Sequence, residues 1–159
     1  MSERIKTAVL RDFSVSLSRA AGLSADDAAL LTDSILFAEC RGVTSHGLLR
    51  LPQYIARLRS GATASNVPMP FTMESGGTAR LDAQNGLGQL AGRKASDKAE
   101  KLAAEYGVSF VAVANSNHFG TGAWYAIPAA RRGFFAFNIS SAASAMAPHG
   151  AAQPLLGTD

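Results

Sequence analysis

The feature that most constrains the fold is the alternation of short apolar runs with helix-like segments in the second half of the chain. Runs 78–82 and 108–114 flank a segment of helical character at 88–104, and run 134–139 follows a predicted helix at 122–132. Run 108–114 is rich in β-branched residues, so we expect a strand covered on both faces. This order of elements predicts an α/β fold with a parallel sheet.

The first part of the chain has a helical pattern instead. Apolar residues recur at helical spacing over 4–21, where Gly22 closes the segment, and a second helix is predicted over 24–39. These two helices should form an αα-hairpin. Residues 61–77 are rich in Asn, Pro, Ser and Gly and lack periodicity. We therefore divide the chain into a helical region, a connection and an α/β region: 1–60, 61–77 and 78–159.

The composition excludes several classes of protein. Hydrophobic residues at 47% and charged residues at 17% are typical of a globular chain rather than a disordered one. The net charge of +3 is mild, and the basic residues do not alternate with aromatic residues, so no nucleic-acid partner is expected. No run approaches membrane-spanning length. The single Cys40 excludes an internal disulfide and fits a cytoplasmic protein, in which it should be an inert buried thiol.

A polar stretch at 115–122 follows run 108–114 and precedes a predicted helix. Ligands of open α/β sheets bind where strands end, so this stretch is a candidate site. His118 is able to titrate near neutral pH and to transfer a proton, and Gly120 lets the backbone approach a ligand closely. The structural alternative is a loop histidine that hydrogen bonds only to its neighbours. No metal-binding cluster is expected.

A second polar set precedes the connection. If one helix began at Ser45, His46, Arg50 and Tyr54 would share one face. An arginine binds a carboxylate in a planar, two-pronged geometry, while histidine and tyrosine supply hydrogen bonds, so the set suits a small carboxylate substrate. A helix beginning near Pro52 is the alternative, because proline inside a helix removes a hydrogen bond. An exposed polar face without a ligand also remains open.

The segment 86–91 matches the dinucleotide-binding pattern G-x-G-x-x-A between a predicted strand and a predicted helix. That pattern also requires an acidic residue at the end of the next strand to bind the ribose. Here the next strand ends in Ala114, Asn115 and Ser116, and Glu105 belongs to the end of the preceding helix. An ordinary Rossmann site is therefore disfavoured.

Four motifs, in order along the chain, resemble the malate/L-lactate dehydrogenase family, which is distinct from the Rossmann-fold dehydrogenases of the same names. Members of that family include ureidoglycolate dehydrogenase, sulfolactate dehydrogenase and piperideine-2-carboxylate reductase. The motifs are Arg41-Gly42 with Ser45-His46-Gly47 and Arg50-Leu51-Pro52-Gln53-Tyr54, then Asn85-Gly86-Leu87-Gly88-Gln89, then Asn115-Ser116-Asn117-His118-Phe119-Gly120, and Pro154-Leu155-Leu156-Gly157-Thr158.

The resemblance implies an oxidoreductase that uses NAD or NADP to interconvert a 2-hydroxy acid and a 2-oxo acid, or to reduce a cyclic imine carboxylate. It also implies a family-specific α/β fold and a homodimer. By motif, His118 resembles the general acid/base, and His46, Arg50 and Tyr54 resemble the substrate pocket. Arg50 is the expected partner of the substrate carboxylate. The sequence does not fix which acid is used, nor NAD against NADP.

The chain departs from the family after run 134–139. Family members commonly continue Thr-Asn-Ser-Ser-Pro there, where this chain has Ser140 and Ser141 followed by alanines. Ser140, Ser141 and Gly120 are the cofactor contacts that the resemblance implies. Family members are considerably longer, so we expect an N-terminal fragment or a truncated form whose exposed apolar surface favours self-association. The alternative function is a catalytically inactive homologue that acts as an interaction or small-carboxylate-binding module.

Overall fold

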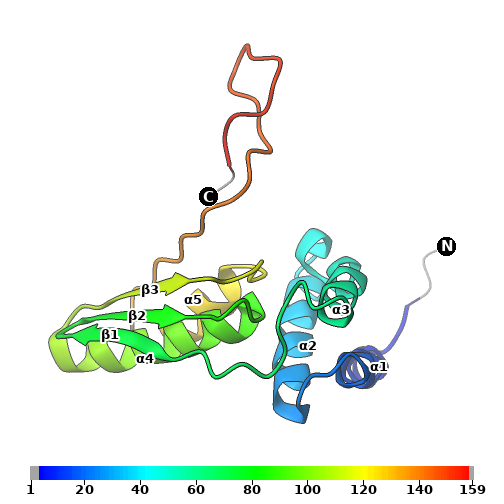
Figure 1. Cartoon of the computed structure of the whole chain (residues 1–159), viewed down its shortest axis with the longest axis horizontal. Helices are drawn as coiled ribbons and strands as arrows, with labels where there is room; N and C mark the ends of the chain where they lie inside the picture. The colour runs from blue at the N-terminus through cyan, green and yellow to red at the C-terminus, as the bar shows by residue number, and fades with distance from the viewer. Residues whose placement is uncertain (1–3, 158–159) are drawn as a thin grey trace.

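The computed structural model describes residues 4–157, which form a group of helices beside a small sheet with its own helices (Figure 1). The segment that follows helix α5 projects away from both parts. The mixture of helices and strands confirms the α/β class. Thr158, the last residue of the fourth family motif, lies outside the described residues.

Helices α1 (Thr7–Ala20) and α2 (Ala25–Glu39) form the αα-hairpin that the periodicity predicts. The Ser24 hydroxyl accepts a hydrogen bond from the backbone N–H of Asp27 at 3.1 Å. This side chain satisfies one of the free N–H groups at the start of α2 and fixes where the helix begins.

Two short 3₁₀ turns, Thr44–His46 and Leu48–Arg50, precede helix α3 (Leu51–Arg59). Pro52 lies in the first turn of α3, where its missing N–H removes no helical hydrogen bond. The interpretation of one helix from Ser45 onward is therefore wrong, and the alternative of a helix beginning near Pro52 is confirmed.

One hydrophobic core joins α2, α3 and the residue that precedes α4. Burial of apolar side chains contributes about 25 cal/mol for each Å² removed from water, so this core supplies most of the stability of the helical part. Tyr54 belongs to it and is only 4% exposed, which fixes the position of its ring. The core consists of Leu23, Ala28, Leu31, Ile35, Leu51, Tyr54, Ile55, Leu58 and Leu87.

The sheet has three strands in the order β1 (Phe71–Ser75), β2 (Thr78–Asp82) and β3 (Phe110–Ala114). Strand β1 is antiparallel to β2, and β2 is parallel to β3. Strands β2 and β3 confirm two predicted strands. Strand β1 is a correction, because it lies inside the segment 61–77 that was assigned to a connection. Four of its five residues are exposed, so it lacks the apolar periodicity that would have revealed it.

Helix α4 (Gly88–Tyr106) packs against β2 and β3, and α5 (Ala123–Arg131) packs against α4 (Figure 1). The sequence predicted these helices over 88–104 and 122–132, so each predicted end lies within two residues of the observed one. Gly107 ends α4 in the left-handed conformation, with φ of 83°, which glycine adopts without a steric penalty. The parallel strands and their crossover helix therefore place the loop after β3 beside the start of α4.

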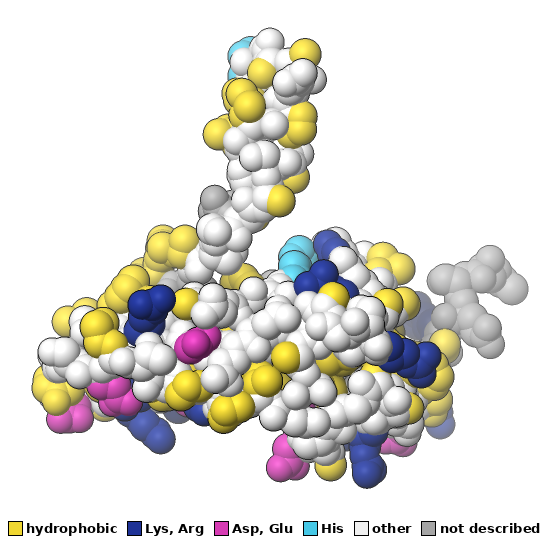
Figure 2. Space-filling model, in the orientation of Figure 1, with side chains coloured by type: hydrophobic (Ala, Val, Ile, Leu, Met, Phe, Trp, Pro, Cys, Tyr) yellow, Lys and Arg dark blue, Asp and Glu magenta, His cyan; other side chains and the backbone are white. Residues whose placement is uncertain are grey.

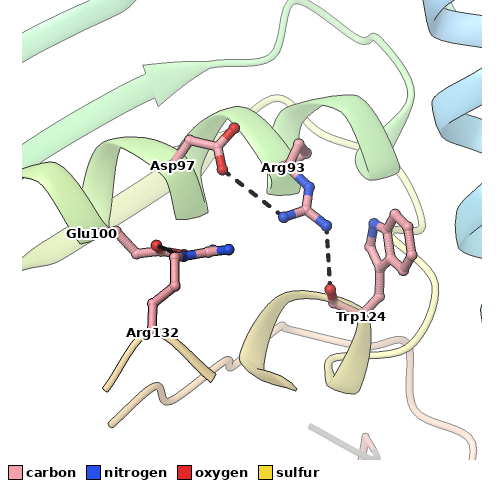
Figure 3. Close-up of polar contacts among 5 residues, drawn as sticks. All are labelled: Arg93, Asp97, Glu100, Trp124 and Arg132. Atoms are coloured by element: carbon pink, nitrogen blue, oxygen red, sulfur yellow. Dashed lines mark hydrogen bonds and ion pairs between the residues drawn. The ribbon is translucent and has the colours of Figure 1, made fainter. Parts of the chain in front are cut away.

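Helix α5 is held on α4 by polar contacts (Figure 3). Arg93 donates a hydrogen bond to the carbonyl oxygen of Trp124 at 3.3 Å and lies 3.9 Å from the carboxylate of Asp97. Arg132 donates two hydrogen bonds to Glu100. These contacts hold the segment that follows the polar loop 115–122.

Two sequence predictions are wrong: that β3 is covered on both faces, and that segment 134–139 forms a strand. Strand β3 is not covered on both faces, since Phe110 is 67% exposed. Segment 134–139 forms no strand and leaves the body of the molecule, with its apolar side chains in solvent (Figures 1 and 2). Phe135 is 92% exposed and Phe137 is 77% exposed. The apolar pattern of this segment is that of a strand, but within the described residues it has no pairing or covering element to stabilise one.

Candidate active site

The polar loop 115–122 begins where β3 ends and is tied at once to the neighbouring strand. Asn115 has φ of 52°, a left-handed conformation that asparagine tolerates. Its side-chain amide donates to a carboxylate oxygen of Asp82, at the end of β2, at 2.9 Å. This hydrogen bond, together with one from the backbone N–H of Gln84, lowers the pKa of Asp82. The loop is thus fixed to the carboxyl ends of two parallel strands.

Asn117 fastens the same loop to the helical part. Its amide oxygen accepts a hydrogen bond from Nη2 of Arg57, on α3, at 2.8 Å. Its amide nitrogen donates to the carbonyl oxygens of Asn85 and Gly86 at 3.0 and 2.9 Å. Sequence reasoning assigned no role to Arg57, although it lies one turn after Tyr54 on the same helix. Arg57 and Asn117 together hold the neighbouring His118 against α3.

His118, in the polar loop, lies against Tyr54 of α3. The Tyr54 hydroxyl lies 2.7 Å from Nδ1 of His118, and the backbone N–H of Gly120 donates to the same nitrogen at 3.3 Å. A nitrogen that accepts from a backbone N–H carries no hydrogen, so the Tyr54 hydroxyl also donates to it and the neutral ring carries its hydrogen on Nε2. Burial raises the pKa of Tyr54 to about 12, which keeps the hydroxyl protonated.

His46 and Arg50 complete the cluster from the two 3₁₀ turns. The rings of His46 and His118 are stacked, with centroids 5.3 Å apart. The pKa of His118 is lowered from 6.5, first by burial and then by the charges of Arg50 and His46. The pocket therefore favours the neutral imidazole of His118 at neutral pH.

Arg50 is a half-buried cation without an acidic partner. Its Nε donates to the carbonyl oxygen of Ser45 at 2.7 Å, and Nη1 donates to the side chain of Gln53 at 3.0 Å. Within residues 4–157 no carboxylate forms an ion pair with it. An arginine that its neighbours orient but do not neutralise is suited to bind a carboxylate.

The turns that present His46 and Arg50 depend on Glu39, at the end of α2. Its carboxylate accepts a hydrogen bond from the backbone N–H of Leu48 at 2.8 Å. Gly47 packs so closely on Glu39 that a Cβ atom there would lie 2.1 Å from the carboxylate oxygen. A larger residue at Gly47 would push the Glu39 carboxylate away from the Leu48 N–H, which gives the glycine of the Ser-His-Gly sequence a packing role. Sequence reasoning did not identify Glu39, because its partner is a backbone group of a loop.

The two glycines of the G-x-G-x-x-A segment pack against the chain itself. A Cβ atom on Gly88 would lie 2.2 Å from the carbonyl oxygen of Asn117 and 2.6 Å from that of His118. A Cβ atom on Gly86 would lie 2.3 Å from the Met69 side chain. Close packing therefore accounts for both glycines, and Gly88 allows the loop with His118 to rest on the start of α4.

Ser140 and Ser141 lie in the projecting segment. Within residues 4–157 neither serine hydrogen bonds to His118 or to Arg50, whereas Gly120 lies beside the ring of His118. The segment is tied to the polar loop earlier, where the Asn138 amide donates to a carbonyl oxygen of that loop at 3.5 Å. The structure thus brings Gly120 into the cluster and leaves the two serines outside it.

A cavity of about 390 Å³ opens at the carboxyl ends of β2 and β3, lined by Asp82, Gln84, Asn85, Asn115 and Ser116. The lowered pKa of Asp82 keeps its carboxylate ionised at neutral pH, so the wall of this cavity is anionic. A pyrophosphate group would be repelled there. This cavity is therefore not suited to the pyrophosphate of a dinucleotide.

Other features give no second site. No group of three His, Cys, Asp or Glu side chains within residues 4–157 is arranged to hold a metal ion. None of the helices that the structure describes has the length and apolar character to cross a membrane. Cys40 is exposed, so the expectation of a buried thiol is wrong: it is the residue that follows the last turn of α2.

The chain matches known proteins over almost its whole length. A family model described as malate/L-lactate dehydrogenase matches residues 5–159. L-sulfolactate dehydrogenase of Methanocaldococcus jannaschii is 38% identical over 87% of this chain and 40% of its own length. (2R)-3-sulfolactate dehydrogenase (NADP(+)) of Chromohalobacter salexigens is 35% identical over all of this chain and 47% of its own length.

The solved structure of malate dehydrogenase from Pyrococcus horikoshii OT3 is similar, with a TM-score of 0.80 and 33% identity. The similarity covers 82% of this chain and 38% of that one. The chain thus spans less than half the length of the relatives it matches. The matched residues, the fold and the order of the four motifs agree, and this chain belongs to the malate/L-lactate dehydrogenase family.

Proposed function

We propose that these residues form the substrate-binding and proton-transfer part of an NAD(P)-dependent oxidoreductase that interconverts a 2-hydroxy acid and a 2-oxo acid. The observation that carries the proposal is the meeting of His118 with Tyr54, His46 and Arg50, which come from separate parts of the chain. The cluster combines a titratable group with a cation that no carboxylate of the described residues neutralises. The dehydrogenases of this family use nicotinamide cofactors, which supply or accept a hydride.

In the proposed reaction, Arg50 binds the carboxylate of the substrate and orients its 2-oxo group toward His118. Reduction of a carbonyl group builds negative charge on its oxygen. Protonated His118 carries a hydrogen on Nε2, the ring nitrogen that Tyr54 does not contact, and gives this proton to that oxygen, which leaves the ring neutral. Because the pKa of His118 is lowered, its protonated form is a stronger acid than an ordinary imidazolium.

The cofactor contacts are a separate part of the proposal. Gly120, Ser140 and Ser141 are the proposed contacts by family motif, and further contacts would come from parts of a family-length protein that these residues do not include. The proposal includes both NAD and NADP as cofactors, and one relative carries NADP(+) in its name. The anionic cavity at Asp82 is not proposed as a cofactor site.

We also propose a homodimer in the cytoplasm. Helix α1 packs on α2 through small side chains, Ser14 and Ser18, which are buried. Its opposite side exposes Val9 and Phe13, at 57% and 60%, and Ile5, which precedes the helix, is 55% exposed. A contiguous apolar face of this kind favours an interface between subunits. Sedimentation velocity should show a dimer that Phe13→Ser dissociates, and a monomer at all concentrations would contradict this proposal.

The experiment that tests the function uses a family-length protein carrying these residues, either natural or completed with the corresponding part of a relative. Oxidation of NADH and NADPH is followed with pyruvate, oxaloacetate and other 2-oxo acids. We expect turnover with at least one acid and its loss in His118→Ala. Absence of turnover with every acid and both cofactors, while the protein still binds carboxylates through Arg50, would favour the carboxylate-binding module instead.

A further inference from the structure

The proposed site is assembled from two regions that segment 61–77 separates in the sequence. Arg50 and Tyr54 belong to the helical region, whereas His118 belongs to the loop that follows β3. Proton transfer between His118 and a substrate bound by Arg50 requires these regions to keep one relative position, because the reacting groups must be aligned closely. The contacts that fix this position are therefore part of the catalytic apparatus.

Two neighbouring side chains of α3 contact two consecutive residues of the loop. Tyr54 and Arg57 are three residues apart, so they lie on the same side of the helix. The Tyr54 hydroxyl lies 2.7 Å from Nδ1 of His118, and Nη2 of Arg57 donates to Oδ1 of Asn117 at 2.8 Å. A single hydrogen bond fixes a distance and leaves rotation about it free, whereas a second bond beside it also fixes the orientation of the loop.

Arg57 also belongs to a closed ring of hydrogen bonds between the two regions. Its Nη2 donates to the carbonyl oxygen of Ala62 at 3.1 Å, and Nδ2 of Asn85 donates to the same oxygen at 3.4 Å. Nδ2 of Asn117 closes the ring by donating to Oδ1 of Asn85 at 3.0 Å. Nε of Arg57 donates to the buried hydroxyl of Thr63 at 3.1 Å. Although the Arg57 side chain is exposed, three protein acceptors therefore hold its guanidinium group.

We propose that Arg57 is a positioning residue that acts through Asn117: it fixes the loop so that His118 is aligned with a substrate bound to Arg50. Within residues 4–157 Arg57 forms no hydrogen bond with His118 or with Arg50, so its effect on the reaction is indirect. This inference rests on the proposed role of His118 in proton transfer.

The pKa of His118 reports its position. Burial lowers this pKa first, and the charges of Arg50 and His46 lower it further. Glu39, on α2, binds a backbone N–H of the second 3₁₀ turn, and Tyr125, on α5, donates to a backbone carbonyl of the loop. The first turn of α4, residues 88–91, has no charged side chain. A ring that moves away from these surroundings into solvent should therefore have a higher pKa, closer to 6.5.

The first test is a ¹H NMR titration of the histidine rings of this chain without substrate or cofactor, with His118→Asn identifying the His118 signal. We expect a wild-type pKa below 6.5 that rises toward 6.5 in Arg57→Met and in Asn117→Ala. Arg59→Met is the matched control, because Arg59 is an exposed arginine of the same helix, and it should leave this pKa unchanged. An unchanged pKa in Arg57→Met would overturn the inference.

A double variant separates position from charge. Arg57→Met removes a positive charge, which by itself would raise the pKa of a nearby imidazole, whereas Asn117→Ala changes no charge. If Arg57 acts through Asn117, Arg57→Met should have little further effect on the pKa of His118 in an Asn117→Ala background. An undiminished effect there would show that the charge acts directly and would contradict the proposed route. Arg57→Lys keeps the charge with one nitrogen in place of three, so its pKa of His118 should lie between those of wild type and Arg57→Met.

Kinetics of an active family-length protein provide the second test. In Arg57→Met kcat should fall by about tenfold or more with little change in KM, because Arg50 keeps its own contacts and still binds the carboxylate. If the wild type shows no turnover while the pKa of His118 responds as expected, the proposed function fails and this inference stands. Wild-type turnover with unchanged kcat and unchanged pKa in Arg57→Met would overturn this inference alone.

Discussion

The cluster around His118 and the projecting segment after α5 differ in the contacts that fix their side chains in place. His118 contacts Tyr54 and Gly120, and its loop is bound to α3 through Arg57. The projecting segment gives the polar loop a long hydrogen bond from Asn138 and exposes large apolar side chains (Figure 2).

The difference indicates which functions these residues can perform together. Substrate binding and proton transfer need groups held within a fraction of an ångström, and the chain supplies those supports itself. The proposed cofactor contacts Ser140 and Ser141 lie where the described residues offer no such support. Proton transfer and carboxylate binding are thus organised locally, whereas cofactor binding depends on further structure.

The largest effect should follow from His118→Ala in an active family-length protein. Loss of a general acid typically lowers the rate by about 10²–10⁴-fold, so kcat should fall by this factor with little change in KM. Steady-state kinetics of 2-oxo acid reduction measure it. A kcat within about twofold of the wild type would remove His118 from the reaction.

Gly88→Ala tests whether close packing holds the polar loop. The new Cβ atom would overlap the carbonyl oxygens of Asn117 and His118, so we expect a loss of about 1–3 kcal/mol in the free energy of unfolding, measured with urea. Gly122→Ala is the matched control at the other end of the loop, where a Cβ atom finds its nearest neighbour at 3.6 Å. Equal stability losses in the two variants would contradict the packing account.

The pH dependence of stability should reflect the lowered pKa of His118. The folded state binds this proton less tightly than the unfolded chain, whose histidine titrates near 6.5. Stability should therefore be highest above pH 6.5 and should fall as the pH drops through 6.5 toward the folded pKa. Urea unfolding across this range measures the loss. A His118→Asn variant should lack this component of the slope, and an identical slope in both proteins would be inconsistent with the shift.

The smallest effect should come from shortening the chain after Gly133. The His118 ring should keep its tautomer and its contact with Tyr54, because the bond that Asn138 gives the loop is long, at 3.5 Å, and does not reach the ring. Self-association should decrease, since Phe135, Phe137 and Ile139 are removed. NMR spectra of the ring and light scattering measure the two outcomes. Loss of the His118–Tyr54 contact would show that the two regions are not independent.

Sequence periodicity predicted the elements whose signals are local. The apolar spacing over 4–21 and 24–39 predicted α1 and α2. Strand β1 was not predicted, because four of its five residues are exposed and its sequence therefore has no apolar periodicity, although it pairs with β2. Segment 134–139 has a strand pattern but no partner among the described residues, and pairing is what stabilises a strand.

The candidate site was partly predictable for the same reason. His118, Arg50 and Tyr54 stood out by residue type and motif, although the one-helix argument for their proximity was wrong: two 3₁₀ turns and α3 bring them together. Arg57 and Glu39 were missed because each acts through a contact distant in sequence, with Asn117 and with a backbone N–H. Such contacts have no local signature.

The most direct measurement of the central claim is a calorimetric titration of this chain with a 2-oxo acid, such as oxaloacetate, in wild-type, Arg50→Ala and Arg59→Ala forms. Arg59 is an exposed arginine of α3 and serves as the matched control. We predict saturable binding that Arg59→Ala preserves and that Arg50→Ala weakens by at least about tenfold, as expected for loss of a charged hydrogen bond. Absence of saturable binding, or equal affinity in all three forms, would contradict the assignment of the substrate site to these residues.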